Sequence, residues 1–303
     1  MHTKDIKKDS LTAWILASRP KTLIGAAVPV MIGLALAYKD SALYEGNPFH
    51  WLPAVLCLLF AWIMQIDANF INDFFDYARG NDDVETRLGP RRACAQGWVS
   101  VDSMKHAIAI TTCVACIVGL PLVLYGGLEM ILIGILCVVF CFLYTTYLSY
   151  VGMGDVLVIL FFGIVPVCVP YYIQLHTCSS FIFLVSLACG MVIDTLLVVN
   201  NFRDRDNDRE AGKSTLVVKI GEKASLQLYL GLGYGACVMG FAFLTNGFTL
   251  AFLLPMIYLV FHHYTYMRIR RINRGKSLNM CLGDTARNIF IYGACVTLGI
   301  LLS

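Results

Sequence analysis

Carboxylate and carboxamide side chains gather at one point in the first third of the chain, at the end of an otherwise apolar stretch. At about 100° per helical residue, five positions share one face; they are Asn69, Asn72, Asp73, Asp76 and Gly80. Carboxylates on one helical face cannot neutralise one another, and in a low-dielectric pocket they repel and take up protons. A bound cation removes this conflict, so the pattern predicts a metal site.

A similar cluster ends an apolar stretch in the second half of the chain. Asn201, Asp204 and Asp208 share a helical face, and Asp194 lies two turns earlier near the same face. We interpret the two clusters as a degenerate internal repeat. A long polar segment follows each of them, at 78–103 and at 202–224, and loops of this length above a site are candidate lids.

The oxygen ligands in both clusters suit Mg²⁺, which proteins hold through one or two carboxylates and complete with substrate phosphates and water. Basic side chains interleaved with the acids suit the phosphate oxygens that a metal leaves free. These basic residues are Arg79, Arg91, Arg92, Arg203 and Lys213. Two acidic helices that face each other therefore predict a diphosphate clamp with bridging Mg²⁺ as the cofactor.

Other acidic residues in the chain have two interpretations. Those in the polar segments either belong to the clamp or are solvated loop charges; they are Asp82, Asp83, Glu85, Asp206 and Glu210. Asp67, Asp155 and Asp194 lie within apolar stretches. There an acid is either functional or a polar contact between packed helices.

The composition places these clusters in a membrane. Of the 303 residues, 58% are hydrophobic and 14% are charged, and the mean hydropathy is +0.71. About a quarter of the residues in soluble domains are charged, so too little polar surface remains to cover a globule. The same composition excludes a disordered chain, a disulfide-stapled secreted module and a nucleic-acid binder. We predict an integral membrane protein whose partner is the lipid bilayer.

Nine stretches are apolar enough to cross a bilayer as helices of about 20 residues. They are 22–38, 51–77, 104–124, 129–148, 154–174, 181–201, 225–245, 248–267 and 285–302. Their continuous apolar character lacks the alternation of a membrane β-barrel. We predict an all-α membrane protein with a single multi-pass domain over 1–303. Its first segment, 1–20, is expected to be cytoplasmic, with a short interfacial helix at 10–18.

The basic residues fall on one side of the nine predicted spans. Of the 23 Lys and Arg residues, 21 lie before the first span or around the connections 2–3, 6–7 and 8–9. The positive-inside rule then makes the N-terminus and the acidic clusters cytoplasmic and the C-terminus external, which predicts a multi-pass protein of the cell membrane. Nearly all of the 12 cysteines lie inside the spans, where Cys acts as a small apolar packing residue.

The paired clusters resemble the aspartate motifs of the UbiA superfamily of intramembrane prenyltransferases. The likeness is carried by Asn72-Asp73-x-x-Asp76-x-x-x-Gly80-x-Asp82 and by Asp204-x-x-x-Asp208. Segments such as Arg19-Pro20-Lys21-Thr22-Leu23 and Gly152-Met153-Gly154-Asp155 are similar to the branch of that family that prenylates 1,4-dihydroxy-2-naphthoate. Between Tyr144 and Tyr150 that pattern has a turn with Gly or Pro, whereas this chain has Thr-Thr-Tyr-Leu-Ser.

The resemblance implies transfer of a polyprenyl group from polyprenyl diphosphate to 1,4-dihydroxy-2-naphthoate, with decarboxylation and diphosphate release. It implies demethylmenaquinol as the product, a step of menaquinone biosynthesis. The implied catalytic residues are Asp73, Asp76, Asp204 and Asp208, and the implied Mg²⁺ ligands add Asn72 and Asp82 to these. Asn69 and Asn201 are expected to bind diphosphate together with the five basic residues. The acceptor is expected to contact Lys21, Arg91 and Tyr144.

Two other functions fit parts of this pattern. A relative in the same family with another acceptor, such as 4-hydroxybenzoate or a haem or chlorophyll precursor, would use the same motifs. A cation-coupled transporter would also use Asp and Asn within its spans as ion ligands. Transport predicts acids near the middle of the membrane, whereas the strongest acidic clusters here lie at one end of the spans.

Overall fold

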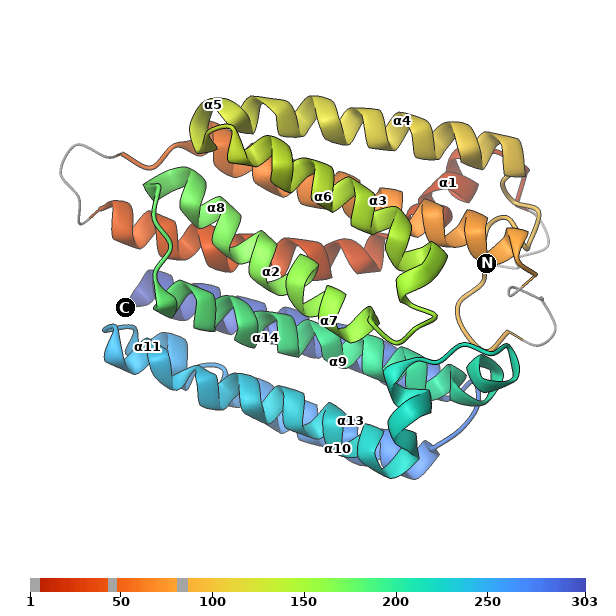
Figure 1. Cartoon of the computed structure of the whole chain (residues 1–303). Helices are drawn as coiled ribbons and strands as arrows, with labels where there is room; N and C mark the ends of the chain where they lie inside the picture. Colours follow the sequence, from red (N-terminus) through yellow and green to blue (C-terminus); the bar gives the residue numbers. More distant parts are fainter. Residues whose placement is uncertain (1–5, 43–47, 81–86) are drawn as a thin grey trace.

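Long helices lie side by side along most of the chain (Figure 1). The computed structural model describes residues 6–42, 48–80 and 87–303. Within these residues, nine helical units are long and apolar enough to cross a membrane. They are α2 (Pro20–Ser41), α3 (Trp51–Ala78), α4–η2–α5 (Val101–Gly126), α6–η3 (Glu129–Leu148), α7–η4–α8 (Gly154–Leu175), α9 (Ser180–Glu210), α10–α11 (Leu216–Thr245), α12–α13 (Thr249–Ile272) and α14 (Leu278–Leu302). The predicted all-α membrane fold with nine spans is confirmed.

Several spans contain a change of helix type or a break. The segments are α4 (Val101–Gly119), η2 (Leu120–Leu122), α5 (Val123–Gly126), α6 (Glu129–Leu143), η3 (Tyr144–Leu148), α7 (Gly154–Ile159), η4 (Leu160–Ile164), α8 (Val165–Leu175), α10 (Leu216–Met239), α11 (Phe241–Thr245), α12 (Thr249–Leu253) and α13 (Met256–Ile272). Both η3 and η4 are π-helical. Single π-helical turns of this kind are frequent at functional sites.

A short helix precedes the first span, within the segment where an interfacial helix was predicted. This helix, α1 (Leu11–Ser18), begins after Ser10, whose hydroxyl accepts the Ala13 N–H at 3.3 Å. Arg19 follows with a left-handed φ of 51°, and Pro20 begins α2. The reversal at Arg19 turns the chain from the surface helix into the bundle.

The prediction of a long loop after the second acidic cluster was wrong. Helix α9 continues through the cluster to Glu210, and α10 begins at Leu216. No Gly or Pro interrupts 201–210, and local contacts support the helix, including the Arg205 guanidinium at 4.2 Å from the centre of the Phe202 ring. A left-handed glycine, Gly221 (φ 79°), then breaks the first turns of α10.

Helices α3 and α9 both end on the same side of the bundle, at the right of Figure 1, while the C-terminus lies at the opposite end. The α7–η4 segment packs closely on α9 through glycines. A Cβ on Gly163 would lie 2.5 Å from the Gly190 Cα, so the two backbones touch where side chains would otherwise separate them. This contact sets the spacing of two walls of the cavity described next.

Candidate active site

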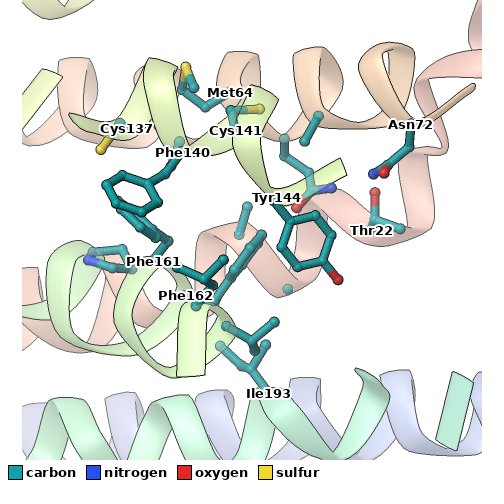
Figure 2. Close-up of a pocket in the computed structure, with 18 of the residues that line it drawn as sticks. Thr22, Met64, Asn72, Cys137, Phe140, Cys141, Tyr144, Phe161, Phe162 and Ile193 are labelled. Atoms are coloured by element: carbon teal, nitrogen blue, oxygen red, sulfur yellow. The ribbon is translucent and has the colours of Figure 1, made fainter. Parts of the chain in front are cut away.

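A cavity of about 1030 Å³ lies between the helices. On the side where α3 and α9 end, its wall is polar and includes Lys21, Asn72, Asp76, Arg91, Arg92, Asn200, Asn201, Lys213 and Asn279. Deeper in the bundle the wall is apolar and includes Met64, Cys137, Phe140, Phe161, Phe162 and Val169. Figure 2 shows Asn72 and Thr22 on one side of Tyr144, and Phe140 and Phe161 on the other.

The apolar part of the cavity reaches the outer surface of the bundle beside α6. Leu120, Ile131 and Ile135 line the cavity and are also 65%, 44% and 54% exposed. In a membrane, this surface contacts acyl chains. A long hydrocarbon ligand therefore has an apolar route from the bilayer to the polar end of the cavity.

At the end of α3, the predicted single face divides into two stripes. Asn72 and Asp76 line the cavity. The Asn72 amide oxygen accepts the Thr145 hydroxyl at 2.7 Å, and Asp76 accepts a hydrogen bond from Arg92 at 2.7 Å. This stripe presents one amide and one carboxylate, one turn apart, to any ligand in the cavity.

The second stripe of α3 packs against neighbouring backbone instead. Asp73 is buried, and its two oxygens accept the N–H groups of Ala93 and Cys94 at 2.8 and 2.9 Å. The Asn69 amide donates to the Ser18 carbonyl at 2.9 Å and to the Thr22 hydroxyl at 3.0 Å. Asp73 thus holds the following loop and Asn69 holds the α1–α2 junction. Their predicted contacts with metal and diphosphate remain predictions.

At the end of α9, carboxamides line the cavity while the carboxylates pair with basic residues. Asn200 and Asn201 are in the cavity wall, whereas Asp204 and Asp208 are not among the lining residues in the described part of the chain. The Arg203 guanidinium donates to both oxygens of Asp204, at 2.8 and 2.5 Å. Lys213 lies 3.7 Å from an Asp208 oxygen.

The loop that follows α3 connects the two helix ends. The Arg203 guanidinium donates to Asn279 at 2.9 Å, and the Asn279 amide donates to the Leu88 carbonyl at 2.7 Å. A Cβ on Gly89 would lie 2.7 Å from an Arg203 nitrogen, so a side chain there would displace the guanidinium. No sequence pattern marked Asn279, because a single polar residue at the start of a helix is common. Its importance comes from the contacts it makes between α9, α14 and the loop.

Two further predicted residues lie elsewhere. Arg79 points to η3, where its guanidinium donates to the carbonyls of Thr145 and Thr146 at 3.3 and 2.6 Å. It stabilises the π-helical turn in this arrangement, and its contact with diphosphate stays a prediction. Asp82, predicted as a metal ligand, lies outside the described residues.

Tyr144 stands where the polar and apolar parts of the cavity meet (Figure 2). The Thr-Thr-Tyr-Leu segment that replaces a Gly/Pro turn forms the π-helix η3 with Tyr144 as its first residue. Residues from the ends of both helices, Asp76 of α3 and Asn201 of α9, line this same cavity.

The oxygen donors in the cavity wall fit Mg²⁺. They are the Asp76 carboxylate and the carboxamides of Asn72, Asn200 and Asn201. In the described part of the chain, no three His, Cys, Asp or Glu side chains form a group that could hold a metal by themselves. In proteins, Mg²⁺ commonly takes several of its ligands from substrate phosphates and water.

Sequence comparison identifies the family. Residues 26–284 match the UbiA prenyltransferase family. The chain belongs to the UbiA prenyltransferase family. The resemblance seen in the paired aspartate motifs is thereby confirmed for most of the chain.

Several relatives within the UbiA family share a name. The 1,4-dihydroxy-2-naphthoate octaprenyltransferase of Escherichia coli is 32% identical over 303 residues, with 96% of each chain covered. The protein of the same name from Haemophilus influenzae is 34% identical over 232 residues, with 73% of each chain covered. The structure of a UbiA homolog from Archaeoglobus fulgidus bound to GPP and Mg²⁺ matches 96% of this chain and 100% of its own, with a TM-score of 0.66 and 14% identity. This structural likeness confirms the UbiA fold.

Proposed function

We propose that this UbiA-family chain transfers a polyprenyl group from polyprenyl diphosphate to 1,4-dihydroxy-2-naphthoate. Carbon dioxide and diphosphate leave, and the product is demethylmenaquinol, an intermediate of menaquinone biosynthesis. The observation that carries the proposal is a single cavity with a charged end at α3 and α9 and an apolar end open to the bilayer. The names of the E. coli and H. influenzae relatives support the naphthoate acceptor.

The two parts of the cavity match the two parts of the donor. The isoprenoid tail lies against the apolar wall, and the diphosphate lies at the polar end, where Arg91, Arg92 and Lys213 provide positive charge. Asn72 and Asp76 would hold Mg²⁺ there, together with Asp73, Asp204 and Asp208. When bound, Mg²⁺ supplies Lewis-acid stabilisation of the departing diphosphate.

The position of Tyr144 suits the carbon that reacts. With diphosphate at one end and the tail at the other, the bond between them lies beside the Tyr144 ring. Aromatic faces stabilise positive charge that develops on an allylic carbon, and Phe161 and Phe162 extend this aromatic wall. The apolar surroundings also exclude water, which would otherwise capture the allylic cation.

The acceptor carries a carboxylate, and two exposed basic residues in the cavity wall are placed to bind it. Lys21 lies in the first turn of α2, and Arg91 lies in the loop after α3. Replacing Lys21 by Ala is expected to raise the KM for the naphthoate by about tenfold, since a charge-assisted hydrogen bond is lost. The KM for polyprenyl diphosphate should be unchanged. An unchanged naphthoate KM would remove Lys21 from the acceptor site.

The distribution of Lys and Arg residues indicates how the chain is oriented in the membrane. We place the N-terminus and the polar end of the cavity in the cytoplasm and the C-terminus outside, because the basic residues gather around the helix ends at the polar side. A cysteine is introduced after Ser303 in a variant whose 12 native cysteines are replaced by serine or alanine, and its thiol labelling in intact cells tests this orientation. If the cysteine is labelled only after the membrane is broken, the C-terminus is cytoplasmic and the proposed orientation is wrong.

A transfer assay with purified protein tests the whole proposal. Labelled polyprenyl diphosphate is incubated with 1,4-dihydroxy-2-naphthoate, 4-hydroxybenzoate or no acceptor, each with and without Mg²⁺. Prenylated naphthoate is expected only with Mg²⁺ and with the naphthoate present. If only 4-hydroxybenzoate is prenylated, the chain is still a prenyltransferase, but the proposed naphthoate acceptor is wrong.

A further inference from the structure

Two buried carboxyl groups lie outside the acidic helix ends, and one of them is in the cavity wall. Asp155, near the start of α7, is 6% exposed and lines the cavity, and Asp194, on α9, is 1% exposed. Among the described residues, neither oxygen of Asp155 and not Oδ1 of Asp194 has a hydrogen-bond partner. Burying polar atoms without partners is costly. A group in the cavity wall with this property is suited to a ligand that supplies the missing hydrogen bond.

The packing of α7 against α9 brings the two carboxyl groups together. The helices run antiparallel, with Gly163 against Gly190 and Gly154 against Leu197. Asp155 and Asp194 lie between these two contacts, one on each of the packed helices. The unpartnered oxygens of Asp155 are hydrogen-bond acceptors in the cavity wall.

The pair also lies at the reacting region. The point where a Cβ on Gly154 would stand is 3.8 Å from the Tyr144 hydroxyl, so the start of α7 lies directly beside this ring. Tyr144 marks the boundary between the polar and apolar parts of the cavity (Figure 2). The acceptor ring must reach this boundary, because the bond between tail and diphosphate lies there.

We infer that Asp155, supported by Asp194, binds a ring hydroxyl of the aromatic acceptor. The inference rests on the proposed function, since it takes the acceptor to be a hydroxylated aromatic carboxylate. The acceptor's carboxylate is drawn to Lys21 and Arg91 and is repelled by Asp155, whereas a hydroxyl donates to Asp155. These opposite preferences fix the orientation of the ring. Asp155 contacts the acceptor's hydroxyl, and Asp194 is a positioning residue that acts through Asp155.

Binding of two matched ligands tests this role. The dissociation constants of 1,4-dihydroxy-2-naphthoate and of 2-naphthoate, which has no hydroxyl, are measured on the full-length protein in lipid nanodiscs. We expect Asp155→Ala to weaken the dihydroxy ligand by about tenfold or more, as for a lost hydrogen bond to a charged group. Binding of 2-naphthoate should change less than about twofold. Asp155→Asn, which keeps the shape of the side chain, should show a smaller loss with the same selectivity for the hydroxylated ligand.

Asp194 and Asp67 complete the comparison. Asp194→Asn is expected to reduce the preference for the dihydroxy ligand by a few-fold, with the KM for polyprenyl diphosphate unchanged. Asp67→Asn is the matched control, because Asp67 is also buried in a span but bonds to Thr111 and Thr112, away from the cavity. It should leave the preference as in the wild type.

The outcomes separate this inference from the proposed function. An equal loss of both ligands in the Asp155 variants, or no loss of the dihydroxy ligand, overturns the hydroxyl contact while prenyl transfer to the naphthoate stands. If the wild type prenylates 4-hydroxybenzoate instead, the proposed acceptor fails, and the same variants are compared with 4-hydroxybenzoate and benzoate. A wild type that binds neither hydroxylated acceptor overturns both.

Discussion

The ends of α3 and α9 carry the same types of side chain but neutralise their carboxylates differently. At α3, Asp73 accepts two backbone N–H groups of the following loop, and Asp76 pairs with Arg92 of the same loop. At α9, Asp204 pairs with its own neighbour Arg203. Asp208 pairs with Lys213, just beyond the helix. The internal repeat in sequence is therefore not repeated in the contacts.

This difference indicates how each end responds to a ligand. The groups that pair with Asp73 and Asp76 belong to the loop at 87–98. A ligand that displaces these groups would therefore change the conformation of that loop. The partners at α9 are side chains of the helix end, so a ligand there exchanges side-chain contacts only. The loop also reaches the α9 end through Asn279. We therefore expect the loop to transmit events at one end to the other.

Removal of divalent cations is expected to have the largest effect, because it disables both ends together. Chelation should lower prenyl transfer by about a thousandfold or more, since the diphosphate and the acidic helix ends repel without a cation. Added Mg²⁺ should restore the rate, whereas NaCl of equal ionic strength should not. Substantial transfer in the presence of the chelator would contradict a metal role at either end.

Single carboxylate replacements compare the two ends directly. Asp76→Asn and Asp208→Asn should each lower kcat by about a hundredfold and raise the Mg²⁺ concentration for half-maximal rate, if both ends hold the metal. The matched control is Asp206→Asn, because this neighbour of Asp208 has a 45% exposed side chain and pairs only loosely with Arg274 at 3.5 Å. It should retain the wild-type rate. Full activity of Asp76→Asn would show that α3 holds no essential ligand.

Asp73→Asn tests whether the first end is tied to its loop. Asn offers only one acceptor oxygen, so one of the N–H groups of Ala93 and Cys94 loses its partner, and the free energy of unfolding should fall by about 1–3 kcal/mol. Thermal unfolding in detergent and limited proteolysis of the loop at 87–98 measure this. The control is Asp102→Asn, since that side chain is 85% exposed. If the loop remains resistant to proteolysis and only the Mg²⁺ concentration needed for activity changes, the main role of Asp73 is to bind the metal.

The smallest effects are expected at the cations that pair with the acids. Lys213→Met should change the free energy of unfolding by less than about 1 kcal/mol, because its pair with Asp208 is long and partly exposed. The KM for polyprenyl diphosphate should rise a few-fold. Arg92→Met should raise that KM by about tenfold, since the Arg92 side chain is 8% exposed and pairs at 2.7 Å. Equal increases of this KM in the two variants would contradict the proposed difference between the ends of α3 and α9.

The sequence alone determined the number of spans, the positions of both acidic clusters and the short helix before the first span. These features are local. Hydropathy over a window of helix length depends on nearby residues, and so does the spacing that puts Asn72 one turn from Asp76. The family follows from the same local patterns, because its motifs are short. The length of α9 was misjudged because a polar segment outside the membrane can continue a helix when its own side chains support it.

Only the tertiary structure decided which polar residues meet in the cavity. The polar face of α3 is wide enough for two stripes, and the loop at 87–98 and the α1–α2 junction occupy one of them, which leaves Asn72 and Asp76 in the cavity wall. Asp155 and Asn279 gain their roles from helices distant in sequence. Such contacts depend on helix rotation and crossing, which are set by packing partners such as Gly163 and Gly190. The spacing of residues along one helix contains no information about those partners.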